Sequence, residues 1–290
     1  MKQYFSIGGL LNDYRHDRDM SQLDLSSLIN VDVRTVQRWE KDVTLINPDK
    51  EKEIAEATLL PYQLIRNLNA VVPIPTYYDF RIRKYSLTEL NNELPNALWL
   101  KDHVKDFSKR IRTIVSLTDM EVLRKDLLLQ KNNKEPISKN VLSRAIELLP
   151  ELNLIIMDDF GNYSGHCITL PLHASAYEQL KNREISDTDL NVSHLANYKI
   201  MDKPVFFNYD MTADCNDNVF YLAHEYLNFF KQQTSEYKYC SFTMRYDSYK
   251  LNEQLGLKLE WENEIQRDGL GMEYHPRFYV GDFKAYFSQQ

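Results

Sequence analysis

The sequence predicts an α+β protein of several domains: an all-helical N-terminal domain, a linker with a helical connector, and an α/β C-terminal domain with a mixed sheet. Apolar residues recur every three to four positions over 6–68, which is typical of amphipathic helices. After Pro150, strand-like and helix-like segments alternate, which indicates layered α/β structure. A length of 290 residues suits two or three domains. We expect boundaries at 1–70, 71–148 and 149–290.

Composition narrows the class of protein. Hydrophobic residues make up 43% and charged residues 27%, as in ordinary globular chains. We find no apolar run near the length of a membrane span, and charges interrupt the N-terminal apolar stretch, so neither a membrane segment nor a signal peptide is expected. Cys167, Cys215 and Cys240 are widely spaced without a CxxC pair. That usage favours a reducing cytoplasm and argues against disulfides or a zinc site.

The net charge excludes a generally basic nucleic-acid coat. The whole chain carries −7, and residues 1–68 hold nine Lys and Arg against eleven Asp and Glu, a balance of −2. Any binding to nucleic acid must therefore come from a local positive face.

Residues 21–42 predict two short helices joined by a tight turn. Ser21 can cap a helix that begins at Gln22, where Asp24 suits the positive first turn. Leu25 and Ile29 are expected to face inward, and the small Ser26 allows a second helix to approach closely.

The second helix follows a turn at Asn30, a residue type that tolerates left-handed backbone better than most. Asp32 is expected to cap it, and Val36 and Trp39 are expected to face inward. The outward residues are then Val33, Arg34, Gln37, Arg38 and Lys41. Arg paired with guanine and Gln paired with adenine are common major-groove contacts, so this helix is predicted to lie on DNA.

Residues 6–68 resemble the phage-repressor, or xenobiotic-response-element (XRE), family of five-helix DNA-binding domains. The resemblance lies in LLNDYRHDRDMSQLDLSSLINVDVRTVQRWEKD, followed by helices expected near 48–58 and 61–69. It implies that Gln22 contacts the DNA backbone. It also implies that bases are read from the start of the next helix, by Val33, Arg34, Gln37 and Arg38.

The same resemblance implies a structural pair between Arg15 and Glu40. Two positions depart from the family pattern, because Asn30 and Asp42 stand where glycines are usual. Asp42 is expected to weaken the local positive field. The alternative interpretation of 21–42 is a plain helical hairpin with a solvated charged face.

The middle of the chain predicts an extended segment followed by helices. Pro73 and Pro75 exclude a helix from 71–80. Apolar spacing then predicts helical structure over 87–130, including an amphipathic helix at 105–112, and one more helix at 138–149.

The C-terminal part predicts a hairpin of two strands within 152–172. Further strands are expected at 204–211, 239–246, 257–265 and 277–283, and helices at 174–183, 218–233 and 249–256.

This order of elements resembles the GNAT acetyltransferase fold, in which a closing helix ends at a Gly that leads into a strand, here Gly256. Family enzymes hold acetyl-CoA phosphates on a Gly-rich loop at a helix N-terminus. Here that place reads TADCNDNV (212–219), with Asp214 and Asp217 and without Gly, Arg or Lys. A general-acid Tyr of the family is replaced by Asn252. The resemblance therefore implies the fold, whereas these departures argue against catalysis.

Two other patterns are weaker. His166 and Cys167 are adjacent, and adjacent strand residues point to opposite faces, so they are not expected to act as a pair. His224 begins a helical zinc motif whose second ligand position is Asn228, so no metal site is expected.

The sequence as a whole predicts a transcriptional regulator that binds double-stranded DNA as a homodimer. Its C-terminal domain is expected to sense a small-molecule or acyl ligand, to dimerise, or both. One alternative is an acetyltransferase with a DNA-targeting module, and another is a partner-binding protein of the toxin–antitoxin type. No catalytic residue, metal or cofactor is predicted.

Overall fold

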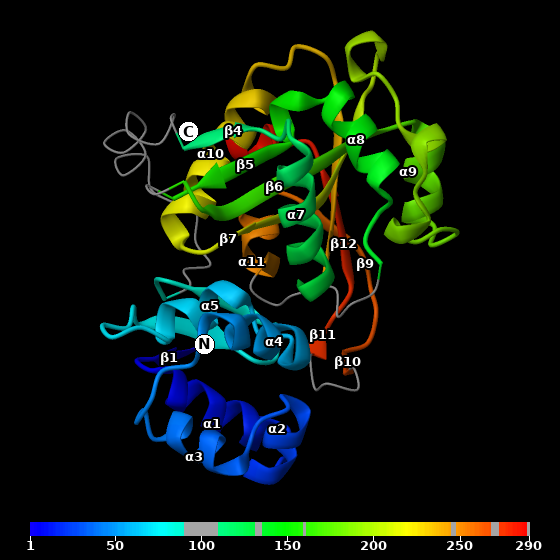
Figure 1. Ribbon diagram of the computed structural model, residues 1–290. Coiled ribbons are helices and arrows are strands. Elements are labelled where there is room, and N and C mark those ends of the chain that lie inside the picture. The colour runs from blue at the N-terminus through cyan, green and yellow to red at the C-terminus, as the bar shows by residue number, and fades with distance from the viewer. Residues whose placement is uncertain (90–109, 131–134, 159–160, 245–247, 268–272, 289–290) are drawn as a thin grey trace. The chain divides into compact units, whose positions relative to one another are not determined.

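A computed structural model describes residues 1–89, 110–130, 135–158, 161–244, 248–267 and 273–288 (Figure 1). The protein is α+β. The chain forms two compact units, one of 1–90 together with 267–273, and the other of 91–266 together with 274–290. Residues 71–148, expected as linker and connector, are thus divided between the two units.

The first unit contains the five predicted helices. These are α1 (Ile7–Asp17), α2 (Gln22–Leu28), α3 (Val33–Glu40), α4 (Pro48–Thr58) and α5 (Tyr62–Leu68). Their apolar faces meet in one core, in which Leu10, Leu25, Val36 and Leu64 are fully buried. The apolar spacing of three to four residues therefore located these helices correctly.

A small antiparallel sheet completes this unit. Its strands are β1 (Lys2–Tyr4), β2 (Thr76–Asp79) and β3 (Lys84–Ser86), in that order. The extended conformation predicted for 71–80 is present in β2, but β2 pairs with β1 and its Tyr78 lies in the helical core. This segment is part of the helical unit, because a strand at the very N-terminus supplies its hydrogen-bonding partner.

The second unit is built on a seven-stranded mixed sheet. Its strands are β4 (Ile111–Thr113), β5 (Leu154–Met157), β6 (Tyr163–Leu172), β7 (Val205–Ala213), β8 (Lys238–Thr243), β12 (Arg277–Gly281) and β9 (Lys258–Glu262), in that spatial order. Neighbouring strands are antiparallel except for β7 and β8, which are parallel. The hairpin expected within 152–172 is formed by β5 and β6.

Helices cover both faces of this sheet (Figure 1). Residues of α7 (Leu117–Gln130), α8 (Lys139–Leu148) and α9 (Ala174–Lys181) pack with Ile168 and Leu170 of β6 on one face. Residues of α10 (Asn216–Lys231) pack with Cys167 of β6 and Phe206 of β7 on the other. Because β6 lies in the interior of the sheet and is covered on both faces, it is apolar along most of its length.

The remaining elements are short. They are α11 (Tyr249–Gln254), α12 (Lys284–Phe287), a two-stranded sheet of β10 (Gln266–Arg267) and β11 (Glu273–Tyr274), and 3₁₀ turns at 150–152, 187–189, 192–194 and 198–200. Among the residues that the structure describes, no helix is long and apolar enough to cross a membrane.

One expected helix is wrong in part. The spacing of apolar residues predicted helical structure through 111–115, whereas Ile111–Thr113 form β4 and pair with β5. Residues 105–109 of the predicted amphipathic helix lie outside the described part of the chain. A three-residue strand carries no period of its own, so only its distant partner determines its conformation.

A bidentate ion pair fixes the junction between β4 and α7. Asp119 accepts hydrogen bonds from both terminal nitrogens of Arg112, at 2.6 and 2.7 Å, and from the N–H groups of Val115 and Ser116. The Arg112 guanidinium holds the pKa of the Asp119 carboxyl well below its usual range, helped by those backbone donors and opposed by burial.

Because the folded-state pKa of Asp119 is depressed, its contribution to stability is present above the unfolded-state pKa of about 3.9 and is lost as the pH falls towards the folded-state value. We expect Asp119→Ala to lower the free energy of unfolding by about 2 kcal/mol at pH 7, and by progressively less below pH ~4. Urea unfolding of both proteins across this range measures the difference. Asp119→Asn keeps the shape and is the control for charge; an equal loss for Asp119→Ala at pH 7 and pH 3 would contradict the assignment.

Candidate functional site

Two side-chain caps shape the predicted pair of helices. The Ser21 hydroxyl accepts a hydrogen bond from the Asp24 N–H, and the Asp24 carboxylate accepts one from the Ser21 N–H, so α2 begins with a reciprocal capping box. Asp32 caps α3 by accepting from the Arg34 N–H at 2.8 Å. Asn30 has a φ of 49°, as its place in the turn predicted. The two capping residues and the turn residue are therefore confirmed.

The predicted outward face of α3 is also formed. Val36 and Trp39 are buried in the core, whereas Arg34, Gln37 and Arg38 are exposed. Lys41 at the C-cap is exposed as well, and Val33 at the first position is half-buried. One side of α3 thus presents two guanidinium groups and an amide, which are the groups that read base edges in a major groove.

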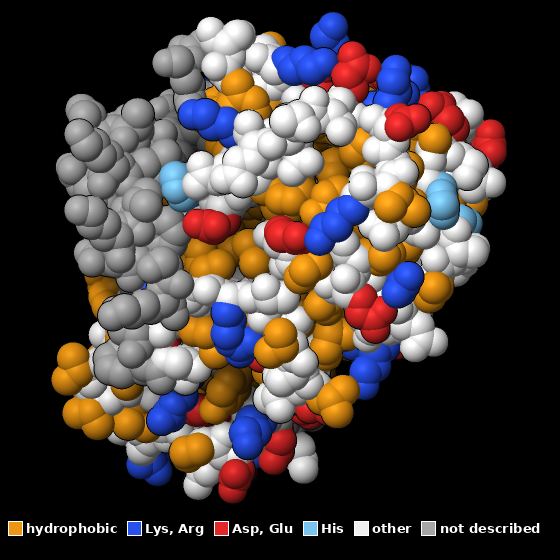
Figure 2. All heavy atoms as spheres, turned by 90° about the horizontal axis from the view of Figure 1, so that it is seen from above, with side chains coloured by type: hydrophobic (Ala, Val, Ile, Leu, Met, Phe, Trp, Pro, Cys, Tyr) orange, Lys and Arg blue, Asp and Glu red, His pale blue; other side chains and the backbone are white. Residues whose placement is uncertain are grey.

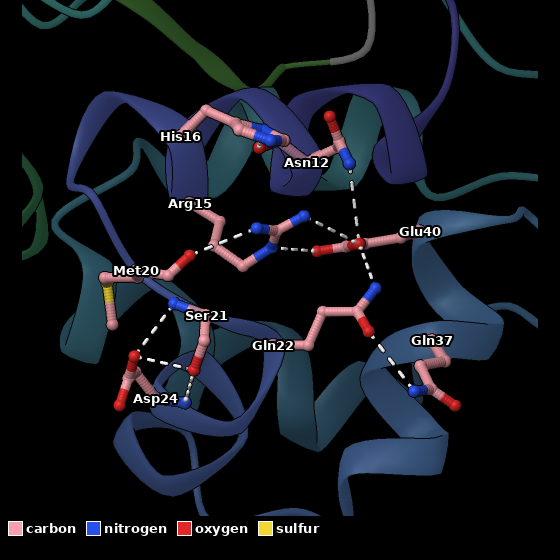
Figure 3. Close-up of polar contacts among 9 residues, drawn as sticks. All are labelled: Asn12, Arg15, His16, Met20, Ser21, Gln22, Asp24, Gln37 and Glu40. Atoms are coloured by element: carbon pink, nitrogen blue, oxygen red, sulfur yellow. Dashed lines mark hydrogen bonds and ion pairs between the residues drawn. The ribbon is translucent and has the colours of Figure 1, made fainter.

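A buried carboxylate lies behind this face (Figure 3). Glu40, whose side chain is 4% exposed, accepts from Arg15 Nε of α1 at 2.9 Å and from Gln22 Nε2 of α2 at 2.7 Å. Asn12 of α1 donates a longer bond to the same carboxylate. Burial opposes the charged form of Glu40, but these donors outweigh it and lower the pKa of the carboxyl. The Arg15–Glu40 pair predicted from the sequence is therefore present, and Gln22 donates a further hydrogen bond to the same carboxylate.

The amide of Gln22 continues this chain of hydrogen bonds. Its Oε1 accepts from Gln37 Nε2 of α3 at 3.2 Å, as Figure 3 shows. The sequence placed Gln22 and Gln37 separately, one against the DNA backbone and one against a base. The contact between them was not predicted, because it depends on how closely α2 and α3 approach.

Asp42 makes a structural contact that was not predicted. Its carboxylate accepts from the Ser6 hydroxyl at 2.7 Å and from the Gly8 N–H at 2.9 Å, so it satisfies donors at the N-terminus of α1. Gly8 is required by this close approach of the chain after α3, since a Cβ there would lie 2.4 Å from the Trp39 carbonyl oxygen and 2.7 Å from Asp42 Oδ1. Asp42 therefore has a structural contact within the helical unit, and its expected effect on the field around α3 stays a prediction.

Charges of both signs are mixed on the face seen in Figure 2, where Lys and Arg side chains lie interspersed with Asp and Glu side chains. The expectation that a small region offers a positive surface stays a prediction.

In the second unit, hydrogen bonds to β6 and to the first turn of α10 hold the loop between β7 and α10. The Asp214 N–H donates to the Ser164 carbonyl, and the buried Asp214 carboxyl accepts from Asn218 Nδ2 at 2.6 Å. Burial raises the pKa of Asp214. Arg110 also reaches the start of α10, where it donates to Asn218 Oδ1 at 3.0 Å. This positive group was missed because it lies far away in the sequence.

A buried polar cluster on β6 and β7 was also missed. His166 is fully buried; its Nε2 lies 2.7 Å from Asp210 Oδ2, and its Nδ1 lies 2.5 Å from the Tyr163 hydroxyl. The same hydroxyl lies 3.2 Å from Asp126 of α7. Cys167 packs on the opposite face of the sheet, as the alternation of strand side chains predicted.

A β-bulge places Asp210 in this cluster. Thr169 of β6 pairs with Asn208, but its neighbour Ile168 pairs with Asp210, so Tyr209 is the extra residue in β7. The bulge turns the Asp210 side chain towards His166. No short-range signal in the sequence marks it, because a bulge is defined by the register of the partner strand.

Comparison with known proteins finds no family model that matches this chain. A search of curated proteins likewise finds no significant match.

The Arg15–Glu40 pair yields a prediction about stability. Arg15→Ala should lower the free energy of unfolding of the helical unit by about 3 kcal/mol, because it leaves a buried carboxylate short of a cationic donor. Amide hydrogen exchange of α1–α3 in the full-length chain reports this loss locally. Lys2→Ala, which removes the exposed ion pair with Asp13, is the control and should cost less than about 1 kcal/mol. If both substitutions lowered the free energy of unfolding by the same small amount, the buried Arg15–Glu40 pair would contribute no more to stability than the exposed one.

Proposed function

We propose that this protein is a sequence-specific DNA-binding transcriptional regulator of the phage-repressor type. The observation that carries the proposal is the exposed face of α3, on which Arg34, Gln37 and Arg38 project from a helix whose other side is anchored by Val36 and Trp39. The capped α2, the left-handed Asn30 and the buried Glu40 support the same interpretation, because together they hold α3 in one orientation.

The charge of the helical domain predicts that each copy of the protein binds DNA only modestly. Residues 1–68 have a net charge of −2, and the proposed DNA-binding face of α3 has three cationic side chains, those of Arg34, Arg38 and Lys41. A single domain is therefore expected to neutralise few phosphates. Two domains on two half-sites would double these contacts, as in dimeric helix-turn-helix proteins. We therefore propose that the protein acts as a homodimer.

For the second unit we propose a ligand-sensing role, with a small-molecule or acyl ligand near the parallel strands β7 and β8. Their paired register ends at Asn208 and Ser241, while β7 continues to Ala213. Ligands of open sheets commonly bind at the carboxyl ends of parallel strands, where the strand arrangement changes direction. The bulge at Tyr209 and the buried His166 lie beside this point, which supports the assignment.

An acetyltransferase is the second candidate. It is supported by β8, α11 and β9, in which Gly256 follows the helix with a φ of 80° and leads into the strand. The Gly-free start of α10 argues against it, as does Asn252, whose buried amide donates to the Ser248 carbonyl and has no proton to give in catalysis. A partner-binding protein of the toxin–antitoxin type is a third candidate.

The first test concerns DNA. Arg34→Ala and Arg38→Ala should each weaken binding to the preferred sequence by roughly 1–3 kcal/mol and relax the preference at one position. Lys41→Ala should weaken binding to all sequences alike and reduce the salt dependence, because a phosphate contact carries no base information. Selection of binding sites from random DNA, followed by titrations at two salt concentrations, measures both effects. Wild-type behaviour of all three variants would refute the assignment of α3.

The second test concerns acetyl-CoA. We expect no saturable binding at micromolar concentration by calorimetry and no release of CoA with amine acceptors, because the Asp214 N–H is already bonded to Ser164 and Asp214 fills the helix start. Arg110 is the feature that favours phosphate there, so Arg110→Ala is measured in parallel. Stoichiometric binding that is lost in Arg110→Ala would restore the enzyme as the leading candidate.

A further inference from the structure

A buried histidine in the second unit lies between two acidic side chains. His166 of β6 is fully buried; its Nε2 lies 2.7 Å from Asp210 Oδ2 of β7, and its Nδ1 lies 3.9 Å from Asp126 Oδ2 of α7. The Tyr163 hydroxyl lies 2.5 Å from His166 Nδ1 and 3.2 Å from Asp126 Oδ2. These four side chains therefore form a continuous chain of polar contacts from α7 to β7.

The protons along this chain can be assigned from the chemistry of each group. An ionised carboxylate only accepts hydrogen bonds, so His166 Nε2 must carry a proton where it faces Asp210. The Tyr163 hydroxyl has one proton, which can point to Asp126 or to His166 Nδ1 but not to both. If it points to Asp126, Nδ1 must carry a proton of its own, and the imidazole is positive. If the imidazole is neutral, Nδ1 is an acceptor and takes the hydrogen bond from Tyr163.

Opposing effects act on the charge of His166. The carboxylates of Asp126 and Asp210 favour a positive imidazole, whereas complete burial opposes one. These two carboxylate side chains are 24% and 21% exposed, so protons can pass between the solvent and the buried ring through them. Histidine is the residue type that ordinarily changes its charge near neutral pH. Both arrangements of protons are therefore accessible to the protein.

The other described neighbours of His166 add no charge to this chain. Across the sheet His166 pairs with uncharged residues, Ile155 of β5 and Thr212 of β7. On α7, the residues on either side of Asp126 that enter the core are Leu123 and Leu127. Titratable groups nearby in the sequence have hydrogen bonds elsewhere, Tyr209 with the N–H of Ile137, Asp158 with Asn162, and Arg110 with Asn218.

We propose that this chain is a pH-sensitive switch, in which protonation of His166 directs the Tyr163 hydroxyl either to α7 or to the imidazole. At the acid end, both ring nitrogens are protonated, Nδ1 donates to the Tyr163 oxygen, and Tyr163 donates to Asp126, which ties α7 to β6. At the alkaline end, one proton has left Nδ1 for the solvent, the Tyr163 hydroxyl has rotated to donate to Nδ1, and its hydrogen bond to α7 is lost. This switch lies in the second unit and does not depend on the proposed role of α3.

The first measurement is the charge of His166 in the full-length protein, by ¹⁵N NMR of the imidazole from about pH 5 to about pH 8.5. His166→Gln identifies the signals. We expect both nitrogens to be protonated at the acid end and only Nε2 to be protonated at the alkaline end. A ring that keeps one form throughout, or that carries its proton on Nδ1 when neutral, overturns the proposal.

The second measurement is amide hydrogen exchange of α7 at the two ends of this range, corrected for the intrinsic effect of pH on exchange. In the wild type, protection of α7 relative to α8 should fall about tenfold as the pH rises, because a hydrogen bond to a charged group is lost. Tyr163→Phe lacks the hydroxyl, so its α7 should have the lower protection at both ends. Tyr177→Phe removes a buried hydroxyl from α9 in the same core; it is the matched control and should behave as wild type.

The variants decide whether the hydroxyl is the link. If protection of α7 depends on pH in Tyr163→Phe as it does in the wild type, the proposal is overturned. Asp126→Ala removes the other partner of the hydroxyl from a helix position that alanine suits, so it provides the same test should Tyr163→Phe fail to fold. Its α7 should likewise lose the dependence on pH, and a wild-type dependence there overturns the proposal. Thermal melting of each variant verifies folding. DNA binding by α3 is measured separately, and its failure leaves this switch standing.

Discussion

The arrangement of the first three helices depends on the buried carboxylate of Glu40. A charge removed from water must be matched by donors, and here the donors come from α1 through Arg15 and Asn12 and from α2 through Gln22. Each helix can satisfy this carboxylate in only one relative placement. Four hydrogen bonds to one carboxylate, two of them from Arg15, restrict how the three helices can shift against one another.

A second acidic residue has a comparable effect at the other end of α1. Asp42 faces the first turn of α1, where unsatisfied N–H groups and the helix dipole favour a negative charge. An acidic domain can therefore still expose cationic side chains on one helix. Two of its carboxylates, those of Glu40 and Asp42, accept hydrogen bonds within the fold, whereas Arg34, Arg38 and Lys41 are exposed.

The sequence predicted the structure correctly where conformation is determined by neighbouring residues in the chain. Caps at Ser21 and Asp32, the turn at Asn30 and the period of each helix act over a few residues, and the structure has each of them. It was uninformative where conformation depends on a distant partner. The strand β4 needs β5, the strand β2 needs β1, and Asp210 faces His166 only because of a bulge.

The Gln22–Gln37 contact shows the same limit within the candidate site itself. Gln37 was placed on the outward face of α3 by helical spacing, whereas Gln22 and the structural role of Glu40 were implied by the family resemblance. The hydrogen bonds that join these residues were not predicted. An amide has a donor side and an acceptor side, so whichever group binds one side determines what the other side offers. Glu40 accepts from Gln22 and Gln22 accepts from Gln37, so a carboxylate that is 4% exposed is linked through two amides to an exposed side chain of α3.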